Sequence, residues 1–286
     1  MPHHVIIPAA STFTTAVVDK IAHIQFNRPQ AFNSMTKAFW SEFPAAVRRI
    51  DADALARALI ITAEGKHFCS GMDIGVFADL GASAASAGDV SVQNEAFRQF
   101  VLVLQDRFSA LQNARMPVIA AVQGGCIGGA VDLVTACDMR FCTSDAFFVI
   151  QEINIGMMAD VGTFPRLCHL LPDGLVRELA FTGRKMLAEE ALRLGFVNAV
   201  FENVVDLHNH ARAIAREIAR KSPVAVTGSK RVIQYAQSHS IEDALDYVAT
   251  WQAGMFSPAQ IAEAFAAKNE KRDGDFPDLR PLRSEM

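Results

Sequence analysis

Three carboxylates stand among almost unbroken apolar residues in the middle of the chain. Asp132 lies in the segment AVDLV, and Glu152 and Asp160 lie in the segment FFVIQEINIGMMAD. Acidic side chains are rarely buried unless they are paired or take part in chemistry. Several carboxylates in one apolar pocket cannot all ionise cheaply, so at least one would stay protonated near neutral pH. This combination is typical of a site that both removes and donates protons.

Each acid also has a structural interpretation, in which it caps a helix or meets an arginine such as Arg166. For one such acid we would prefer that interpretation. Three of them close to glycine-rich turns favour a functional site instead.

Two loops rich in small residues follow apolar runs that predict buried strands. Residues 67–73 (HFCSGMD) follow the run at 58–63, and residues 124–130 (GGCIGGA) follow the run at 117–122. Glycines allow a close approach of the backbone, and a helix N-terminus presents unpaired N–H groups. Two such N–H groups aimed at one oxygen would form an oxyanion hole, although turn formation alone explains the same glycines.

Other chemistries lack their signatures in this sequence. The glycine-rich turn contains neither G-K-[ST] nor G-x-G-x-x-G, and no serine lies in a G-x-S-x-G elbow. His208 and His210 are two residues apart and would diverge on a helix, so we expect no metal site. The cysteines form no C-x-x-C pair and are expected to be reduced thiols: Cys69, Cys126, Cys137, Cys142 and Cys168.

The composition is that of an ordinary globular protein. The 286 residues are 51% hydrophobic, and the net charge of −4 argues against nucleic acid as a partner. No apolar run reaches the roughly 18 residues of a membrane span, and the N-terminus has no signal-peptide pattern. The C-terminus reads SEM and not the peroxisomal S-K-L. We therefore predict a cytoplasmic protein that does not enter a membrane.

Strands alternate with helices up to about residue 200, which predicts an α/β fold. We expect strands at 17–26, 58–63, 117–122 and 139–143, and a loose loop at 75–91. Helices are expected from about residue 33 to 50, over 94–112 and from the glycine turn to about 136. After residue 200 only helices follow, the last capped by Ser257. We divide the chain into a core at 1–203 and a helical region at 204–286.

Together these features resemble the crotonase superfamily, the enoyl-CoA hydratases and isomerases. The resemblance extends over roughly residues 14–270 and keeps the order of the family's motifs. The segments that carry it are NRP at 27–29, FCSGMD at 68–73, AVQG at 121–124 with Gly128-Gly129, Cys137-Asp138, FTGR at 181–184 and GFV at 195–197.

The resemblance implies a spiral of ββα units with a C-terminal helical region that builds trimers or dimers of trimers. It also implies an acyl-CoA thioester as the substrate, with no separate cofactor. An oxyanion hole would come from the N–H groups of Cys69 and Gly129. The substrate-binding residues would be Cys69, Ser70, Gly71, Met72, Asp73 and Gly129.

The acids narrow the resemblance to one subfamily. Typical hydratases have glutamates at the positions of Asp132 and Glu152 and no acid at Asp160. Residues 131–138 and 155–163 instead resemble Δ3,5-Δ2,4-dienoyl-CoA isomerases of fatty acid β-oxidation, and Pro165 in the segment TFPR at 163–166 departs from that pattern. In such an enzyme Glu152 would take a proton from C2, Asp160 would protonate C6, and Asp132 would orient Glu152 or share a proton with it.

Alternative functions remain open at this point. An enoyl-CoA hydratase or a Δ3-Δ2-enoyl-CoA isomerase would also use Asp132 and Glu152. A non-catalytic acyl-CoA-binding subunit belongs to another class, and loss of the pocket acids would mark it. Lys230 and Arg231 are considered for the CoA phosphates.

Overall fold

The computed structural model describes residues 10–76 and 89–282 and contains two sheets. The larger sheet is parallel except for its first strand, which pairs antiparallel with the second. In spatial order its strands are β1 (Phe13–Val18), β2 (Ile21–Phe26), β3 (Ala58–Ala63), β4 (Val118–Val122), β6 (Met139–Thr143) and β9 (Ala199–Phe201). The smaller sheet contains β5 (Gly125–Ile127), β7 (Phe147–Val149) and β8 (Met186–Leu187). The predicted α/β class is therefore confirmed.

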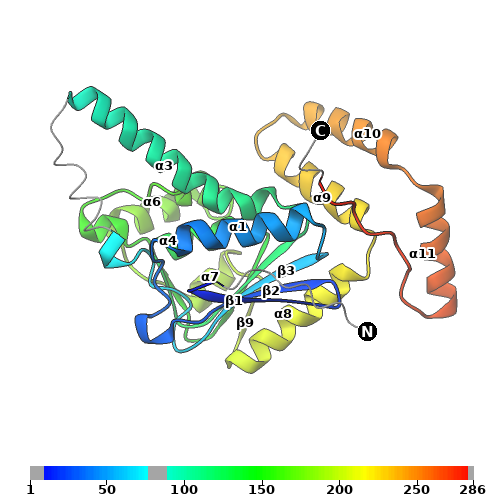
Figure 1. Cartoon of the computed structure of the whole chain (residues 1–286), viewed down its shortest axis with the longest axis horizontal. Helices are drawn as coiled ribbons and strands as arrows, with labels where there is room; N and C mark the ends of the chain where they lie inside the picture. The colour runs from blue at the N-terminus through cyan, green and yellow to red at the C-terminus, as the bar shows by residue number, and fades with distance from the viewer. Residues whose placement is uncertain (1–9, 77–88, 283–286) are drawn as a thin grey trace.

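Helices cover both faces of the larger sheet and continue beyond it. Figure 1 shows α1 (Phe39–Ala52) and α8 (Val204–Ala219) on opposite sides of this sheet. The other helices are η1 (Pro29–Ala31), α3 (Val90–Asn113), α4 (Gly129–Thr135), η2 (Glu152–Ile155), α5 (Thr163–Leu167), α6 (Asp173–Thr182), α7 (Ala188–Arg193), α9 (Pro223–Ala236), α10 (Ile241–Met255) and α11 (Pro258–Glu270).

The alternation of side chains along β3 divides the core into two parts. Leu59 and Ile61 face the main cluster, which also contains apolar residues of α1 and α4. Ala58 and Ile60 face a smaller cluster beneath α8. Because both faces of β3 are covered, its sequence reads as a continuous apolar run, as the prediction required.

The strand predicted at 17–26 is a hairpin of two strands. β1 and β2 pair antiparallel on either side of Asp19 and Lys20, which have φ angles of +50° and +62°. A two-residue hairpin loop of type I′ needs positive φ at both central positions. The prediction was wrong here because neither residue is a glycine or an asparagine, the usual markers of such a turn.

The middle of the chain follows the prediction with two differences. The loop predicted at 75–91 falls largely outside the described residues, and α3 begins at Val90 after a cap by Asp89. The glycine-rich turn contains a short strand, β5, before the predicted helix α4 begins at Gly129. Both differences concern element boundaries, and the buried strands lie where the apolar runs predicted them.

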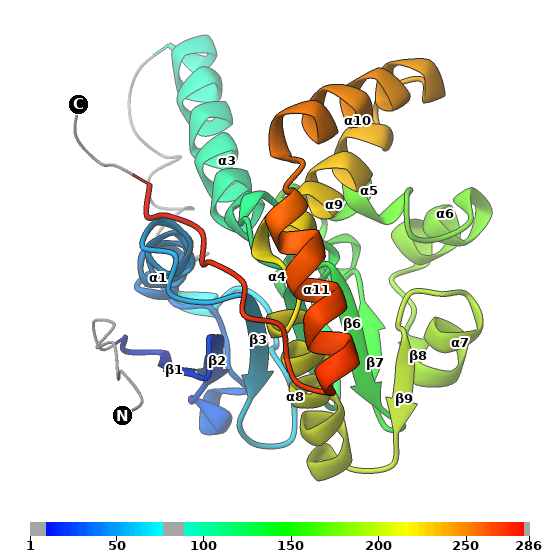
Figure 2. The same cartoon turned by 90° about the vertical axis from the view of Figure 1, so that its right-hand side faces the viewer.

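The C-terminal part is helical, as predicted, and the Ser257 side chain caps α11 by accepting from the Gln260 N–H. α8 packs on the larger sheet, so the packed core continues beyond the boundary that we predicted at residue 203. Figure 1 shows α10 and α11 to one side of the sheets, and in Figure 2, which is turned by 90°, α11 lies in front of the strands. The trimer or dimer of trimers through this region stays a prediction. Within the described ranges, no helix is both long and apolar enough to cross a membrane.

Candidate active site

Asp132 is fully buried on α4, and only one of its oxygens is hydrogen-bonded. Oδ1 accepts from the backbone N–H of Thr163 at 2.7 Å and from the Thr163 hydroxyl at 2.8 Å. Oδ2 is buried and has no partner among the described residues. Burial raises the pKa of Asp132 to about 6, although the bonds from Thr163 act in the opposite direction. The result is a carboxyl group that changes its charge close to neutral pH.

Glu152 begins η2, and two residues separate it from the end of the strand β7. Its Oε1 lies close to the backbone of Gly128, because an ideal Cβ on that glycine would approach it to 3.3 Å. Its Oε2 is buried without a partner in the part of the chain that the structure describes. Burial raises the pKa of Glu152 to about 7, and the charges of Asp132 and Asp160 add to this shift. Glu152 can therefore exchange a proton near neutral pH.

Asp160 lies between η2 and α5, and burial raises its pKa. Its backbone carbonyl accepts from the side-chain amide of Gln105 on α3 at 2.7 Å. The charge of Asp160 also raises the pKa of Asp132, so the three predicted acids act on one another electrostatically. The fold thus brings together carboxylates that are separated in the sequence.

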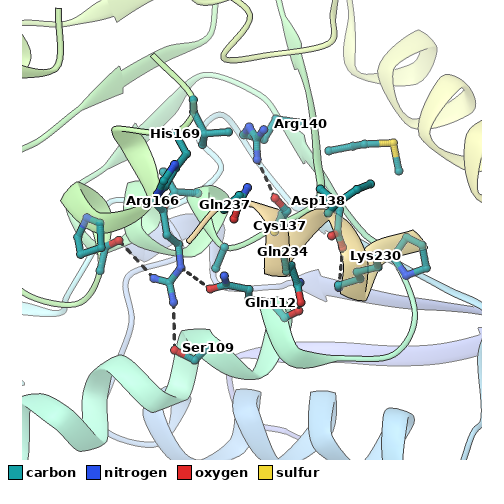
Figure 3. Close-up of a pocket in the computed structure, with 18 of the residues that line it drawn as sticks. Ser109, Gln112, Cys137, Asp138, Arg140, Arg166, His169, Lys230, Gln234 and Gln237 are labelled. Carbon is teal, nitrogen blue, oxygen red and sulfur yellow. Dashed lines mark hydrogen bonds and ion pairs between the residues drawn. The ribbon is translucent and has the colours of Figure 1, made fainter. Parts of the chain in front are cut away.

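Asp160 lines a cavity of about 1350 Å³ between the core and α9. Figure 3 shows part of its lining, where Arg166 donates to Ser109 at 3.0 Å and to Gln112 at 3.0 Å. Apolar side chains such as Val161 and Phe164 complete the wall near Asp160. Asp160 therefore lies between the other two acids and a cavity whose wall is largely apolar.

Two backbone amides converge beside these acids. Met35 pairs with Met72 in a parallel β-bridge, through bonds to the residues on either side of Met72. The N–H of Met35 donates to Gly71 O at 2.8 Å, and the carbonyl of Met35 accepts from the Asp73 N–H at 3.0 Å. Among the described residues, no acceptor is recorded for the N–H of Met72 or for that of Gly129. An ideal Cβ on Gly129 would lie 3.9 Å from the Met72 N, so the two amides are neighbours.

The oxyanion-hole prediction was wrong for Cys69. Its N–H already donates to Gly125 O at 3.2 Å, and its carbonyl accepts from Ile127 N at 3.1 Å. These bonds join the loop to β5 in a bridge between Cys69 and Cys126. The thiol is fully buried, which raises its pKa to about 12 and leaves it uncharged. The N–H without an acceptor in this loop belongs to Met72.

The remaining residues of the first loop hold its shape. Ser70 N donates to Phe32 O at 3.0 Å, and Gly71 has a φ of +87° that favours glycine. The Asp73 carboxylate accepts from the Ser34 hydroxyl at 2.7 Å, and this bond lowers the pKa of Asp73. Contact of Ser70, Gly71 and Asp73 with a substrate stays a prediction.

The sequence analysis missed one residue of this region and misjudged another. Thr163 was not recognised because a lone threonine carries no signal of its partner. Lys230, considered for a CoA phosphate, is buried and donates to Asp138 at 2.7 Å and to the carbonyls of Leu111 and Met116 at 3.1 and 3.0 Å. Its ammonium group is already bonded to these three acceptors, so the suggestion that Lys230 binds a CoA phosphate was wrong.

Within the described residues, no three His, Cys, Asp or Glu side chains lie close enough together to hold a metal ion. The three carboxyl groups interact electrostatically with one another, and Glu152 Oε1 lies beside Gly128, the residue before the free amide of Gly129. Donors aimed at one point can stabilise an oxyanion, and carboxyl groups with raised pKa values can carry protons to and from the adjoining carbon.

This fold with such a site defines a class of α/β enzymes that move protons beside a polarised carbonyl. Residues 17–279 match the family described as Enoyl-CoA hydratase/isomerase. The chain belongs to this family, the crotonase superfamily that the sequence resembles.

Relatives and solved structures agree with this assignment. A Mus musculus protein named Delta(3,5)-Delta(2,4)-dienoyl-CoA isomerase, mitochondrial, is 42% identical over 91% of this chain and 79% of its own length. An Arabidopsis thaliana protein of the same name, peroxisomal, is 39% identical over 91% and 93%. The structure of a probable enoyl-CoA hydratase/isomerase from Mycobacterium abscessus is 29% identical, with a TM-score of 0.80 over 94% of this chain and 100% of that one. The predicted crotonase fold is therefore confirmed.

Proposed function

We propose that this crotonase-family enzyme is a dienoyl-CoA isomerase that converts a 3,5-dienoyl-CoA into a 2,4-dienoyl-CoA. The observation that carries the proposal is the third acid, Asp160, beside the pair Asp132 and Glu152. A hydratase or a Δ3-Δ2-enoyl isomerase can use the pair alone, whereas proton transfer over four carbons needs an acid further along the chain. The names of the relatives from mouse and Arabidopsis support the same activity.

In this proposal Glu152 removes a proton from C2 of the thioester. The electron pair of that C–H bond delocalises into the thioester carbonyl and along the diene, giving a dienolate. The N–H groups of Met72 and Gly129 stabilise its oxygen. A single donor in such a hole contributes about 3–4 kcal/mol in comparable enzymes. This pair replaces the predicted pair of Cys69 and Gly129.

Asp160, in its protonated form, then delivers a proton to C6, and the double bonds move to C2 and C4. Ionised Glu152 and protonated Asp160 must coexist, which is possible because three acids in one buried site do not all ionise together. Asp132 orients Glu152 or shares a proton with it. Beyond C6 the acyl chain would meet the apolar side of the cavity that Asp160 lines.

The test is the ultraviolet spectrum of the product formed from a 3,5-dienoyl-CoA by the wild type and by Asp160→Asn. We expect the wild type to produce the absorbance of a diene conjugated with the thioester carbonyl, and Asp160→Asn to lose it while keeping its thermal midpoint. Asp173→Asn, an exposed acid on α6, is the matched control and should keep full activity. Near-normal turnover by Asp160→Asn would contradict the proposal.

A 2-enoyl-CoA offered in parallel separates the rival functions. A Clostridium acetobutylicum protein named Short-chain-enoyl-CoA hydratase is 32% identical over 88% of this chain and 92% of its own length. Hydration of the 2-enoyl-CoA without conversion of the diene would make this protein a hydratase. Binding of both esters without turnover would make it a non-catalytic acyl-CoA-binding subunit.

A further inference from the structure

Thr163 is the only residue of the described chain with a recorded hydrogen bond to the Asp132 carboxylate, and it uses two donors on one oxygen. Its backbone N–H and its hydroxyl both bond to Oδ1, at 2.7 and 2.8 Å. Thr163 is 1% exposed and Asp132 is 0% exposed, so water does not compete freely for these bonds. Two short bonds from a rigid, β-branched residue fix the rotation of the carboxylate.

This orientation leaves the other oxygen of Asp132 available. Oδ2 is buried without a partner, as is Oε2 of Glu152, within the described residues. A buried polar atom without a hydrogen bond is costly, and functional sites are where such atoms persist. Because the charge of Asp132 also acts on Glu152, the free oxygen of Asp132 can influence the general base directly.

We propose that Thr163 is a positioning residue, whose hydroxyl holds Asp132 ionised and oriented so that Asp132 keeps Glu152 basic enough to take the C2 proton. This inference rests on the proposed function, because it assigns the base of that reaction to Glu152. It adds to that function the residue that sets the pH range in which the base works.

Other charged groups also act on Asp132. Asp160 raises its pKa, and Arg166 on α5 lowers it, while Glu152 from η2 interacts with it from the side of Gly128. The charge of Asp132 also acts on the Cys126 thiol of β5, which burial keeps protonated. None of these groups has a recorded hydrogen bond to the carboxylate, so loss of the Thr163 hydroxyl removes one of only two such bonds.

Removing the hydroxyl favours the protonated form of Asp132. Glu152 then loses a negative neighbour, so it ionises at a lower pH. The acidic limb of kcat/KM reports the ionisation of the base in the free enzyme. The lost hydrogen bond should raise the pKa of Asp132 by about one unit. Because Glu152 feels only the resulting change in the charge of Asp132, we expect the limb to move to lower pH in Thr163→Val by less than that, about half a pH unit. A less basic Glu152 should also lower the plateau of kcat.

The experiment measures kcat/KM on a 3,5-dienoyl-CoA from about pH 5 to pH 9 for four proteins. They are the wild type, Thr163→Val, Thr163→Ser and Thr135→Val. Thr163→Ser keeps the hydroxyl and should restore the wild-type limb. Thr135 is a matched control, because its buried hydroxyl bonds to the backbone carbonyl of Asp132 at 2.8 Å and not to the carboxylate. Thr135→Val should therefore leave the limb in place.

An acidic limb that stays in place or moves upward in Thr163→Val would overturn the inference. So would an equal shift in Thr135→Val, because the effect would then be merely structural. If Thr163→Val does not fold, Thr163→Ala serves as the variant without a hydroxyl. If the wild type does not isomerise the diene, the proposed function fails. Infrared titration of the carboxyl groups in the same variants then tests Thr163 without a substrate: a lowered Glu152 pKa in Thr163→Val supports it, and an unchanged one overturns it.

Discussion

Asp132 and Asp138 are six positions apart in the sequence, yet their carboxylates have different hydrogen-bond partners in the fold. Asp138 Oδ2 accepts from the buried ammonium of Lys230 and from the Val118 N–H, both at 2.7 Å. Asp132 has both of its bonds on one oxygen, from Thr163, and no bonded cation. The first carboxylate is neutralised and anchors α9 to the core. The second keeps an oxygen free, which costs stability and leaves it available for chemistry.

The largest effect should come from the acidic site. Glu152→Gln removes the proposed base while keeping the shape of the side chain, so we expect kcat on a 3,5-dienoyl-CoA to fall about 10²–10⁴-fold. The free energy of unfolding above pH 7 should rise, because a desolvated charge is removed. Steady-state kinetics and urea unfolding measure the two effects. Glu189→Gln, an exposed glutamate on α7, is the control. Loss of stability together with activity would place Glu152 in the same structural category as Asp138.

The next effect concerns the ion pair between the buried Lys230 and the partly exposed Asp138. Lys230→Met leaves the partly exposed Asp138 carboxylate without its cation and the carbonyls of Leu111 and Met116 without their donor, which should cost about 2–4 kcal/mol of unfolding free energy. Urea unfolding measures this loss, and kcat of the folded protein should change far less than in Glu152→Gln. The double variant Lys230→Met/Asp138→Asn should recover part of this loss, because the carboxylate without a cation is then also removed. Lys221→Met replaces an exposed lysine just beyond the C-terminal end of α8 and should leave the unfolding free energy almost unchanged. A stable Lys230→Met would remove the contrast between the two carboxylates.

A smaller effect follows from pH. The pKa of Glu152 is about 7 in the folded protein against its ordinary value of 4.5, so the folded state holds this proton more tightly. Stability from this group is therefore present below pH 4.5 and is lost as pH rises to 7, by up to about 3 kcal/mol. The difference in unfolding free energy between Glu152→Gln and the wild type should grow over this range. A constant difference would show that Glu152 is not desolvated.

His23 acts in the opposite sense and has to be separated from Glu152. Burial lowers the pKa of His23 to about 4 from 6.5, and its Nε2 lies 2.7 Å from the Thr62 hydroxyl. The unfolded chain binds this proton more tightly, so stability is lost as pH falls from 6.5 to 4. For this reason the comparison is made between variant and wild type at each pH, where the contribution of His23 cancels.

Much of this molecule could be predicted from its sequence. The apolar run of β3 and the Ser-Pro cap of α11 depend on local patterns, which survive in the fold. The acids at 132, 152 and 160 were recognisable because charge among apolar residues is conspicuous. These signals are local or compositional, so they do not depend on knowing which distant segments meet.

The errors have the opposite origin. Which N–H of residues 69–72 is free depends on β5, which engages Cys69 from a segment more than fifty residues away. Thr163 bonds to Asp132 only because α5 packs beside α4, and Lys230 bonds to Asp138 only because α9 packs against the core. Whether a hydrogen-bonding group is already paired in the fold depends on partners that are distant in the sequence. A local sequence pattern does not reveal those partners.

The free N–H of Met72 has a consequence for mutational scanning. This donor belongs to the main chain, so it persists with every side chain except that of proline, and a substitution library would record position 72 as tolerant of most changes. Its neighbour Gly71, with a φ of +87° and Ile127 O only 2.7 Å from an ideal Cβ, would be recorded as intolerant. A fitness map would thus highlight the residue that shapes the loop and overlook the one that supplies the donor. Replacing the amide of Met72 by an ester, through chemical synthesis or ligation, is the substitution that would make it visible.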